Sequence, residues 1–316
     1  MAERTKILLL VVGCFSTIFW FVGQGLTIDN YQFFLSRRTP KILAIVLAAV
    51  AISSSSLVFQ TITNNRILTP SILGFDSLYL MIQVLLLVMF GSISFFVLNT
   101  LVNFVFSVFL MVILSISLFH FYFKHHGHNI LTLLLIGIVC GSVFNSITGF
   151  FTMLVDPSEF AIIQNSMFAS FNNINADLVY WSVVPLLICF AMLFRYSKQL
   201  DVMWLGIDNA TSLGVDCKKL TQKLMILITI MIAISTALVG PVLFFGLITV
   251  SLTRELFNRY QHNFLIAVSS LLAIFLLVTG QHIVEKWLSF ETTISVIINF
   301  VGGSYFIFLL LTNRIR

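Results

Sequence analysis

Unbroken apolar runs of about 20 residues recur along this chain, and they constrain its fold more than any other feature. Lipid offers the backbone no hydrogen-bond partners, so a spanning chain must form helices or a closed barrel. Barrel strands alternate apolar and polar residues, whereas these runs are continuous. Only 9% of the residues are charged and 59% are hydrophobic, whereas a soluble domain carries about 25% charged residues. We therefore predict an all-α membrane protein.

Polar breaks between the runs divide the chain into about ten membrane spans. The eighth is the least regular, because Gly240 and Pro241 interrupt an apolar stretch. The first is too long for the core of a cleavable signal peptide and is expected to be a span. No linker is visible, so residues 1–316 are predicted to form a single transmembrane domain. The predicted spans are 6–28, 40–62, 77–95, 99–123, 129–151, 177–196, 222–240, 242–258, 263–284 and 294–312.

Lysine and arginine residues indicate the orientation, because they are retained in cytoplasmic loops. With the amino terminus inside, 13 of the 17 basic residues are cytoplasmic, and the reverse orientation inverts this bias. An even number of spans brings the carboxyl terminus to the same side, so both termini are predicted to be cytoplasmic. The net charge of +5 is therefore attributed to topology rather than to nucleic-acid binding. The basic residues left outside are Arg37, Arg38, Lys41 and Lys286.

Cysteines and histidines show no metal-site pattern. The four cysteines lack CxxC or Cys/His ligand spacing, so neither a disulfide nor a zinc site is expected. The histidines of segment 125–128 are compatible with metal binding, but their place in a basic cytoplasmic loop favours a role in topology. No metal site is predicted.

One segment outside the spans is expected to form a short external helix at about 158–170. It is moderately apolar and follows Asp156 and Pro157, residue types that favour the N-cap and the first helical position. The segment should therefore lie against the external surface.

The longest cytoplasmic stretch contains LGIDNATSLGVD at 205–216, which predicts a short helix at about 207–214. Asp208 is a natural N-cap, and Gly214 suits a helix end with positive φ. About two helical turns are not stable alone in water, so this helix must dock on something. Two partners are open: its own membrane domain, or a separate subunit that approaches its small side chains closely.

Five blocks, in order and with consistent spacing, resemble the FecCD family, the permeases of siderophore, haem and cobalamin ABC importers. The second block departs from the family pattern at Arg66, the fourth at Ser251 and Leu252, and the last at Thr293. The form of the second block is similar to the subgroup that serves catecholate and citrate-catecholate siderophores such as enterobactin, vibriobactin or petrobactin. The blocks are RRTPKILAIVLAAVAISSSSLVFQ at 37–60, NNRILTPSILGFDS at 64–77, LGIDNATSLGVD at 205–216, GPVLFFGLITVSLTREL at 240–256 and ETTISVIINFVGGSYFIFLLL at 291–311.

The resemblance implies a type II ABC importer permease fold and three functional surfaces. The segment at 207–214 becomes a coupling helix for an ATPase. The external basic residues become docking contacts for a binding protein, although they also suit snorkelling at the interface. Polar residues on the second, fifth and tenth spans become a passage between two permeases, although such residues often join helices instead. The coupling candidates are Gly206, Asp208, Asn209, Ala210, Ser212, Leu213 and Gly214; the docking candidates are Arg37, Arg38, Lys41 and Lys286; the pathway candidates are Ser56, Gln60, Asn145, Ser146, Thr148 and Asn299.

The resemblance also implies the partners. The chain has no GxxxxGK[ST] motif, so ATP and Mg are expected on two copies of a separate ATP-binding subunit, and no cofactor is expected on this chain. A second FecCD-type permease, in a heterodimer, and a substrate-binding protein complete the expected complex. Its cargo is a ferric siderophore, and its location is the bacterial cytoplasmic (inner) membrane.

Three other functional classes are compared with the residues of this chain. Permeases for haem or cobalamin share the family pattern. An ion-coupled secondary transporter would need acids within the membrane or broken helices in matching halves, and no pair of acids lies in a span centre. An intramembrane enzyme would need a motif such as HExxH or paired aspartates, and neither occurs. A transport subunit is therefore expected.

Overall fold

The computed structural model describes residues 3–27, 29–125, 130–172, 174–289 and 292–311, and within them the chain is helical with no strand. Each predicted span coincides with a helix. The long helices are α1 (Glu3–Gly23), α2 (Tyr31–Thr63), α3 (Phe75–Phe90), α5 (Thr100–His125), α6 (Ile130–Thr152), α8 (Ala176–Arg195), α11 (Cys217–Val239), α12 (Phe245–Leu256), α13 (His262–Lys286) and α14 (Ile294–Leu311). The short ones are η1 (Pro70–Leu73), α4 (Phe95–Leu98), α7 (Phe160–Met167), α9 (Ser197–Met203) and α10 (Ile207–Ser212).

Seven of the described helices are long and apolar enough to cross a membrane, and two further spans are shorter than predicted. α3 has 16 residues and α12 has 12, whereas α14 covers residues 294–311 of the predicted 294–312. The prediction for the eighth span, 242–258, was too long. Gly240 (φ 93°) and Phe244 (φ 46°) leave the helical region, so the helix begins only at Phe245.

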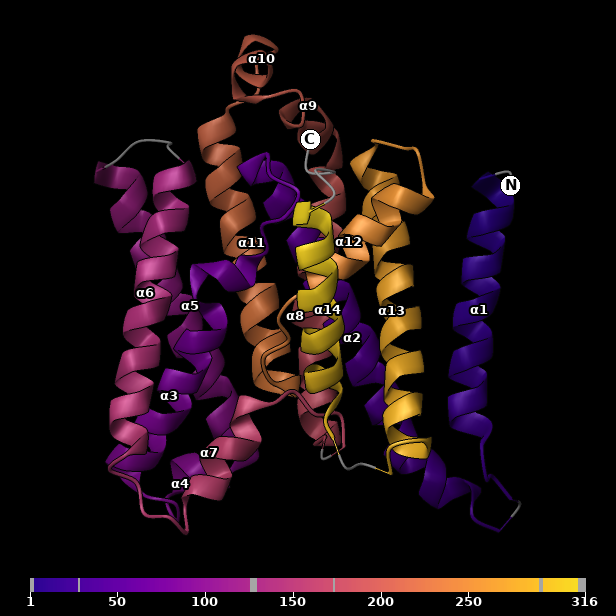
Figure 1. The fold of residues 1–316 in the computed structure, drawn as a ribbon, viewed down its shortest axis with the longest axis vertical. Helices are drawn as coiled ribbons and strands as arrows, with labels where there is room; N and C mark the ends of the chain where they lie inside the picture. Colours follow the sequence, from indigo (N-terminus) through magenta and orange to yellow (C-terminus); the bar gives the residue numbers. More distant parts are fainter. Residues whose placement is uncertain (1–2, 28, 126–129, 173, 290–291, 312–316) are drawn as a thin grey trace.

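The helices stand side by side, and their two ends differ (Figure 1). The start of α1, the end of α14, and α9 and α10 lie at one end, which we call the cytoplasmic end. α4 and α7 lie at the opposite, external end. This arrangement agrees with the predicted even number of spans.

α2 is the central helix of the bundle and packs against α8, α11, α12 and α13. Its serine run, Ser53 to Ser56, is almost wholly buried, and Ser53 lies against Ser270 of α13. A Cβ atom on Gly246 of α12 would lie only 1.9 Å from the Ser56 hydroxyl oxygen. Small residues permit this close approach, which supplies the packing energy between helices in lipid.

The amino-terminal part of α2 departs from the prediction. The second span was expected to open at residue 40, but the helix begins at Tyr31 and Pro40 lies inside it. Proline cannot donate to the carbonyl of the preceding turn, so a helix commonly bends at such a residue. In Figure 1 this part of α2 leads away from the bundle toward the base of α1.

A second close contact joins α6 to the turn between η1 and α3. A Cβ on Gly137 would lie 2.9 Å from the Leu73 Cα, and a Cβ on Gly74 would lie 2.8 Å from the Gly141 Cα. Gly137 and Gly141 are four residues apart, so they share one helix face, as in the small-x-x-x-small contacts of membrane helices. This spacing is visible in the sequence, although the pathway prediction did not use it.

The break between α11 and α12 is covered by the segment after α7. The Ser170 N–H donates to the Val239 carbonyl at 2.9 Å, and Gly240 packs directly on the Ala169 backbone. Non-helical backbone at membrane depth is tolerated where protein covers it. α7 ends at Met167, just before this segment, because Phe168 is already extended.

The external helix is therefore shorter than the predicted 158–170. Asp156 is not its N-cap and Pro157 is not its first residue, since residues 156–159 form a turn and α7 begins at Phe160. The Ser92 hydroxyl donates to the Glu159 carboxylate, which holds this turn against the loop after α3.

Gly246→Ala tests the α2–α12 contact. Alanine is favoured over glycine inside a helix by about 1 kcal/mol. On propensity alone, Gly246→Ala would therefore stabilise the protein. We expect a net loss of about 1–3 kcal/mol, because the methyl group overlaps Ser56. The thermal midpoint of the detergent-solubilised protein measures it. Adding Ser56→Gly should restore part of the loss, and Gly303→Ala, with open space around it, should cause none. A gain in stability for Gly246→Ala would contradict the packing described.

Candidate functional site

α10 is a single short helix whose two ends are shaped by glycines. Gly206 (φ 100°) is its N-cap, so the prediction of Asp208 as N-cap was wrong: Asp208 lies in the first turn, where its charge favours the helix dipole. The predicted positive φ of Gly214 is confirmed at 85°. The Gly214 N–H donates to Thr211 O and the Val215 N–H to Ala210 O, both at 3.0 Å, which is a Schellman ending.

The surface of α10 is open. Of its residues only Ala210 is buried, against the rest of the chain, while Leu213 is 65% exposed just after the helix. Side chains on the helix mostly bond back to their own turn: Asn209 donates to Leu205 O at 2.8 Å and Ser212 to Asp208 O at 3.0 Å. An exposed, rigidly capped helix with small polar residues is suited to docking another protein.

The start of α11, just beyond α10, is capped by an aspartate. Asp216 accepts a hydrogen bond from the Lys219 N–H at 3.1 Å and pairs with the Lys219 ammonium at 3.0 Å. These contacts, the backbone hydrogen bond first, lower the pKa of the Asp216 carboxyl below its ordinary value. The Asp216 carboxylate therefore stays charged and caps the first turn of α11, where the segment after α10 ends.

A polar chain, buried at His262 and Thr61 and partly exposed at Asp201, ties α9, directly before α10, to the helices of the bundle. The Asp201 carboxylate on α9 accepts hydrogen bonds from the His262 N–H at 2.6 Å and binds its ring Nδ1 at 2.7 Å. The opposite ring nitrogen lies 2.7 Å from the Thr61 hydroxyl on α2. His262 is only 1% exposed. Sequence reasoning missed this chain, because its members lie far apart in sequence and belong to no motif.

Two of the predicted docking arginines lie at the start of α2. Arg38 donates to the Val22 carbonyl at 2.7 Å and to that of Gln24, so its charge satisfies the end of α1. Arg37 is exposed, with its guanidinium 4.9 Å from the Phe33 ring centre. Of these two arginines, only Arg37 presents its side chain outward.

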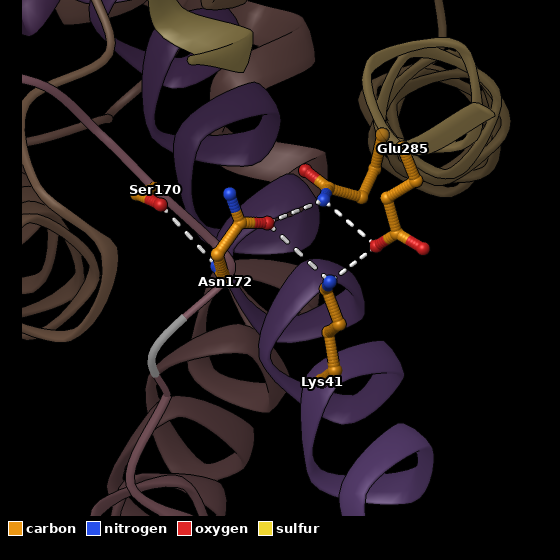
Figure 2. Close-up of polar contacts among 5 residues, drawn as sticks. Lys41, Ser170, Asn172 and Glu285 are labelled. Atoms are coloured by element: carbon orange, nitrogen blue, oxygen red, sulfur yellow. Dashed lines mark hydrogen bonds and ion pairs between the residues drawn. The ribbon is translucent and has the colours of Figure 1, made fainter. Parts of the chain in front are cut away.

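Lys41 belongs to a polar cluster at the external end (Figure 2). It forms an ion pair with Glu285 of α13, and both side chains are largely buried, at 15% and 18% exposure. Its ammonium also donates to the side-chain Oδ1 of Asn172 at 3.4 Å, and the Gln281 amide donates to the same oxygen at 3.0 Å. The cluster therefore links α2, α13 and the segment after α7. Lys286, the fourth predicted docking residue, is exposed nearby on α13.

The predicted pathway residues on α2 face the interior of the bundle. Ser56 lies under α12, and Gln60 is 0% exposed. Both amide atoms of Gln60 lack a hydrogen-bond partner among the described residues. A buried amide without partners is costly, so this position calls for water or another polar group.

The pathway residues on α6 and α14 are not gathered in one cavity. α6 packs on α3 and η1, whereas α14 packs on α12 and α13, and Figure 1 shows them on different parts of the bundle. Asn145 and Ser146 are exposed on α6. Thr148 is buried, and Asn299 of α14 is half-buried with its side-chain oxygen unpartnered among the described residues.

No group of three or more potential metal ligands occurs among the described residues. His126 and His128 of the predicted basic loop lie outside them.

Lys41→Met tests the external cluster. It removes the ion pair with Glu285 and the contact with Asn172, which should lower the free energy of unfolding by about 2 kcal/mol, since hydrogen bonds to charged groups are worth that much. Thermal unfolding in detergent measures this loss. The exchange Lys41→Glu with Glu285→Lys should recover part of it, and Lys286→Met, on an exposed side chain, should cost little. An equal effect of both methionine variants would contradict the pairing.

Comparison with known proteins identifies the family. The model of the FecCD transport family matches residues 7–312. The petrobactin import system permease protein YclO of Bacillus subtilis is 48% identical over 99% of both chains. FatC of Bacillus anthracis, also a petrobactin import system permease protein, is 35% identical over 91% of this chain and 82% of its own length.

A solved structure shares the fold. It is described as an inward-facing conformation of a metal-chelate type ABC transporter, and it superposes with a TM-score of 0.83 over 98% of this chain and 99% of that one, at 22% identity. The motif blocks, the helical bundle and these matches agree. The chain belongs to the FecCD transport family and is a multi-pass membrane transport subunit rather than an enzyme.

Proposed function

We propose that this chain is the permease subunit of an ABC importer that carries a ferric siderophore of the petrobactin type into the cytoplasm. The observation that carries the proposal is the 48% identity to a petrobactin import permease over nearly the whole of both chains. The second motif block resembles the subgroup that serves catecholate and citrate-catecholate siderophores, which includes this substrate. Haem and cobalamin are the alternative substrates, because permeases that resemble the same family pattern carry them.

The proposed complex contains a second FecCD-type permease in a heterodimer, two ATP-binding subunits and a substrate-binding protein in the bacterial cytoplasmic (inner) membrane. ATP and Mg bind to the ATP-binding subunits, and this chain holds no cofactor. Alternating access follows: a loaded binding protein docks at the external end, the ATPases close on ATP, and the passage opens to one side at a time.

α10 is the proposed point where the ATPase acts. Its exposed surface permits docking, and Ala210 and the Schellman ending hold the helix firmly to the chain. Motion imposed on α10 reaches α9, and the Asp201–His262–Thr61 chain then carries it to α13 and α2. This gives the coupling helix a continuous physical route to the central helix of the bundle.

The passage is proposed to run between two permeases rather than inside one. A siderophore complex is too large for a pore within a single bundle of this size. Asn145 and Ser146 are exposed within a spanning helix, where contact with lipid is unfavourable for polar groups. The Ser146 hydroxyl donates to the Ser142 carbonyl of its own helix at 3.0 Å. A partner permease or a water-filled passage on this face of α6 would provide polar contacts for the Asn145 amide.

The external docking contacts are assigned to Arg37 and Lys286, whose side chains are exposed.

Reconstitution tests the substrate. Proteoliposomes containing this chain, its partner permease and the ATPase, supplied with the binding protein, should accumulate radiolabelled iron from ferric petrobactin only when ATP is inside the reconstituted cytoplasmic compartment. Excess unlabelled ferric petrobactin should compete, whereas haem and cobalamin should not. Uptake without ATP would exclude the transporter class, and competition by haem or cobalamin alone would exclude the siderophore.

Gly214 variants test the coupling role. Gly214→Trp places a bulky side chain at the docking surface and forces it into positive φ, so uptake should fall at least tenfold while ATP hydrolysis continues and the protein still inserts. Gly214→Asn should keep most activity, because asparagine tolerates that conformation and stays small. Uptake and ATPase rates are measured on the same proteoliposomes. Normal uptake by the tryptophan variant would contradict a coupling role for α10.

A further inference from the structure

A cavity of about 220 Å³ lies at the cytoplasmic end beside α9, and one of its lining residues, His262, belongs to the proposed coupling route. Its walls come from the loop after α2, the residue after α9, the last turn of α12, the connection between α12 and α13, and the start of α13. Three of its lining residues are arginines and none is acidic. The lining residues that matter here are Arg66, Trp204, Arg254, Phe257, Tyr260 and Leu265.

Two guanidinium groups converge on one indole ring in this cavity. The guanidinium carbon of Arg254 lies 4.4 Å from the ring centre of Trp204, and that of Arg66 lies 5.7 Å from it. Neither arginine forms an ion pair with a described residue. Two like charges are therefore held close together, and the aromatic ring supplies only a weak counterpart.

Arg254 carries the clearest sign of a missing ligand. Its Nε and Nη1 atoms are buried and have no hydrogen-bond partner among the described residues. Buried donors on a charged group are costly when left unpaired, and such groups usually face an acceptor, water or an ion. An anion between Arg66 and Arg254 would satisfy both the donors and the charge.

Two carboxylates near the cavity, those of Asp201 and Glu3, are already bonded to other lining residues. Asp201 is bound to the backbone N–H and the ring of His262. Glu3 of α1 pairs with Arg259 at 2.8 Å. The described part of the chain thus pairs His262 and Arg259 with acids but leaves Arg66 and Arg254 without one.

We propose that this cavity binds a phosphate group, and that its source is the headgroup of an anionic phospholipid of the cytoplasmic leaflet. Guanidinium forks match phosphate oxygens in pairs. Basic pockets between helices at the cytoplasmic surface suit acidic headgroups, which are concentrated there. The volume greatly exceeds the roughly 30 Å³ of one water molecule, which leaves room for a phosphate and part of its glycerol.

The cavity walls also suit a lipid rather than a bare ion. Phe257 and Leu265 give one side an apolar surface, and Tyr260, 74% exposed, lies at the rim as aromatic residues do at membrane interfaces. The site lies where α9, α12 and α13 meet, so a bound headgroup would brace the junction next to the Asp201–His262 contact.

Lipid binding to the protein, purified from membranes with its associated subunits, tests the proposal. The complex is placed in nanodiscs of phosphatidylcholine alone or with phosphatidylglycerol, and retained lipids are counted by native mass spectrometry. We expect phosphatidylglycerol to be retained preferentially. Arg254→Gln and Arg66→Gln should each weaken this preference about tenfold, the effect of one lost charge-assisted hydrogen bond. Arg254→Lys, which keeps the charge, should weaken it less and shows that the fold survives.

Arg195→Gln is the matched control, because Arg195 is exposed at the end of α8 and outside the cavity. Inorganic phosphate is added in a separate arm. Stabilisation by phosphate that depends on Arg254 supports the phosphate site with a soluble source, whereas dependence on phosphatidylglycerol alone supports the lipid. Equal retention of both lipids with no effect of phosphate overturns the proposal. So does loss of the ATPase subunit from the Arg254→Gln complex with unchanged lipid counts, because an acidic side chain of that subunit would then be the ligand.

Discussion

Lipid supplies no hydrogen-bond partners, and this absence explains where the chain can depart from helical geometry. The break between α11 and α12 is the main example within the bundle. There Gly240 and Phe244 adopt positive φ, and the segment after α7 covers the exposed backbone by donating from Ser170 to Val239. The external segment thus completes the interior of the bundle. The short α12 can then pack its glycine against the serines of α2.

Hydropathy predicts which segments leave water, and here each of the ten predicted spans overlaps a helix of the described chain. It reports little about where helices begin or end inside protein. The start of α2 at Tyr31, the short α12 and the N-cap of α10 at Gly206 each depend on local φ values or on contacts with distant segments. The small-residue spacing of Gly137 and Gly141 was readable from the sequence, because packing in lipid favours it.

The polar clusters were beyond sequence reasoning for a different reason. Lys41 was predicted to face a binding protein, and the structure gives it Glu285, which lies far along the chain. The Asp201–His262–Thr61 chain likewise joins three helices that no local motif connects. A charged or polar residue near a span end has several possible partners, and only the packing of helices selects among them. The roles assigned to the coupling, docking and pathway residues therefore stay predictions.

The two polar clusters have a common geometric effect, because each joins α2 to α13. Lys41 and Thr61 are separated by 20 residues of helix, or about 30 Å, which matches the thickness of a bilayer hydrocarbon core. α2 and α13 are therefore pinned to each other near both membrane surfaces and should move as one unit. Among the described residues, no polar cluster of this kind joins α6 to α2, and α6 exposes Asn145 within its spanning length. A rigid α2–α13 pair beside a helix that exposes a polar amide within the membrane is compatible with the proposal that the passage lies between two permeases rather than inside one.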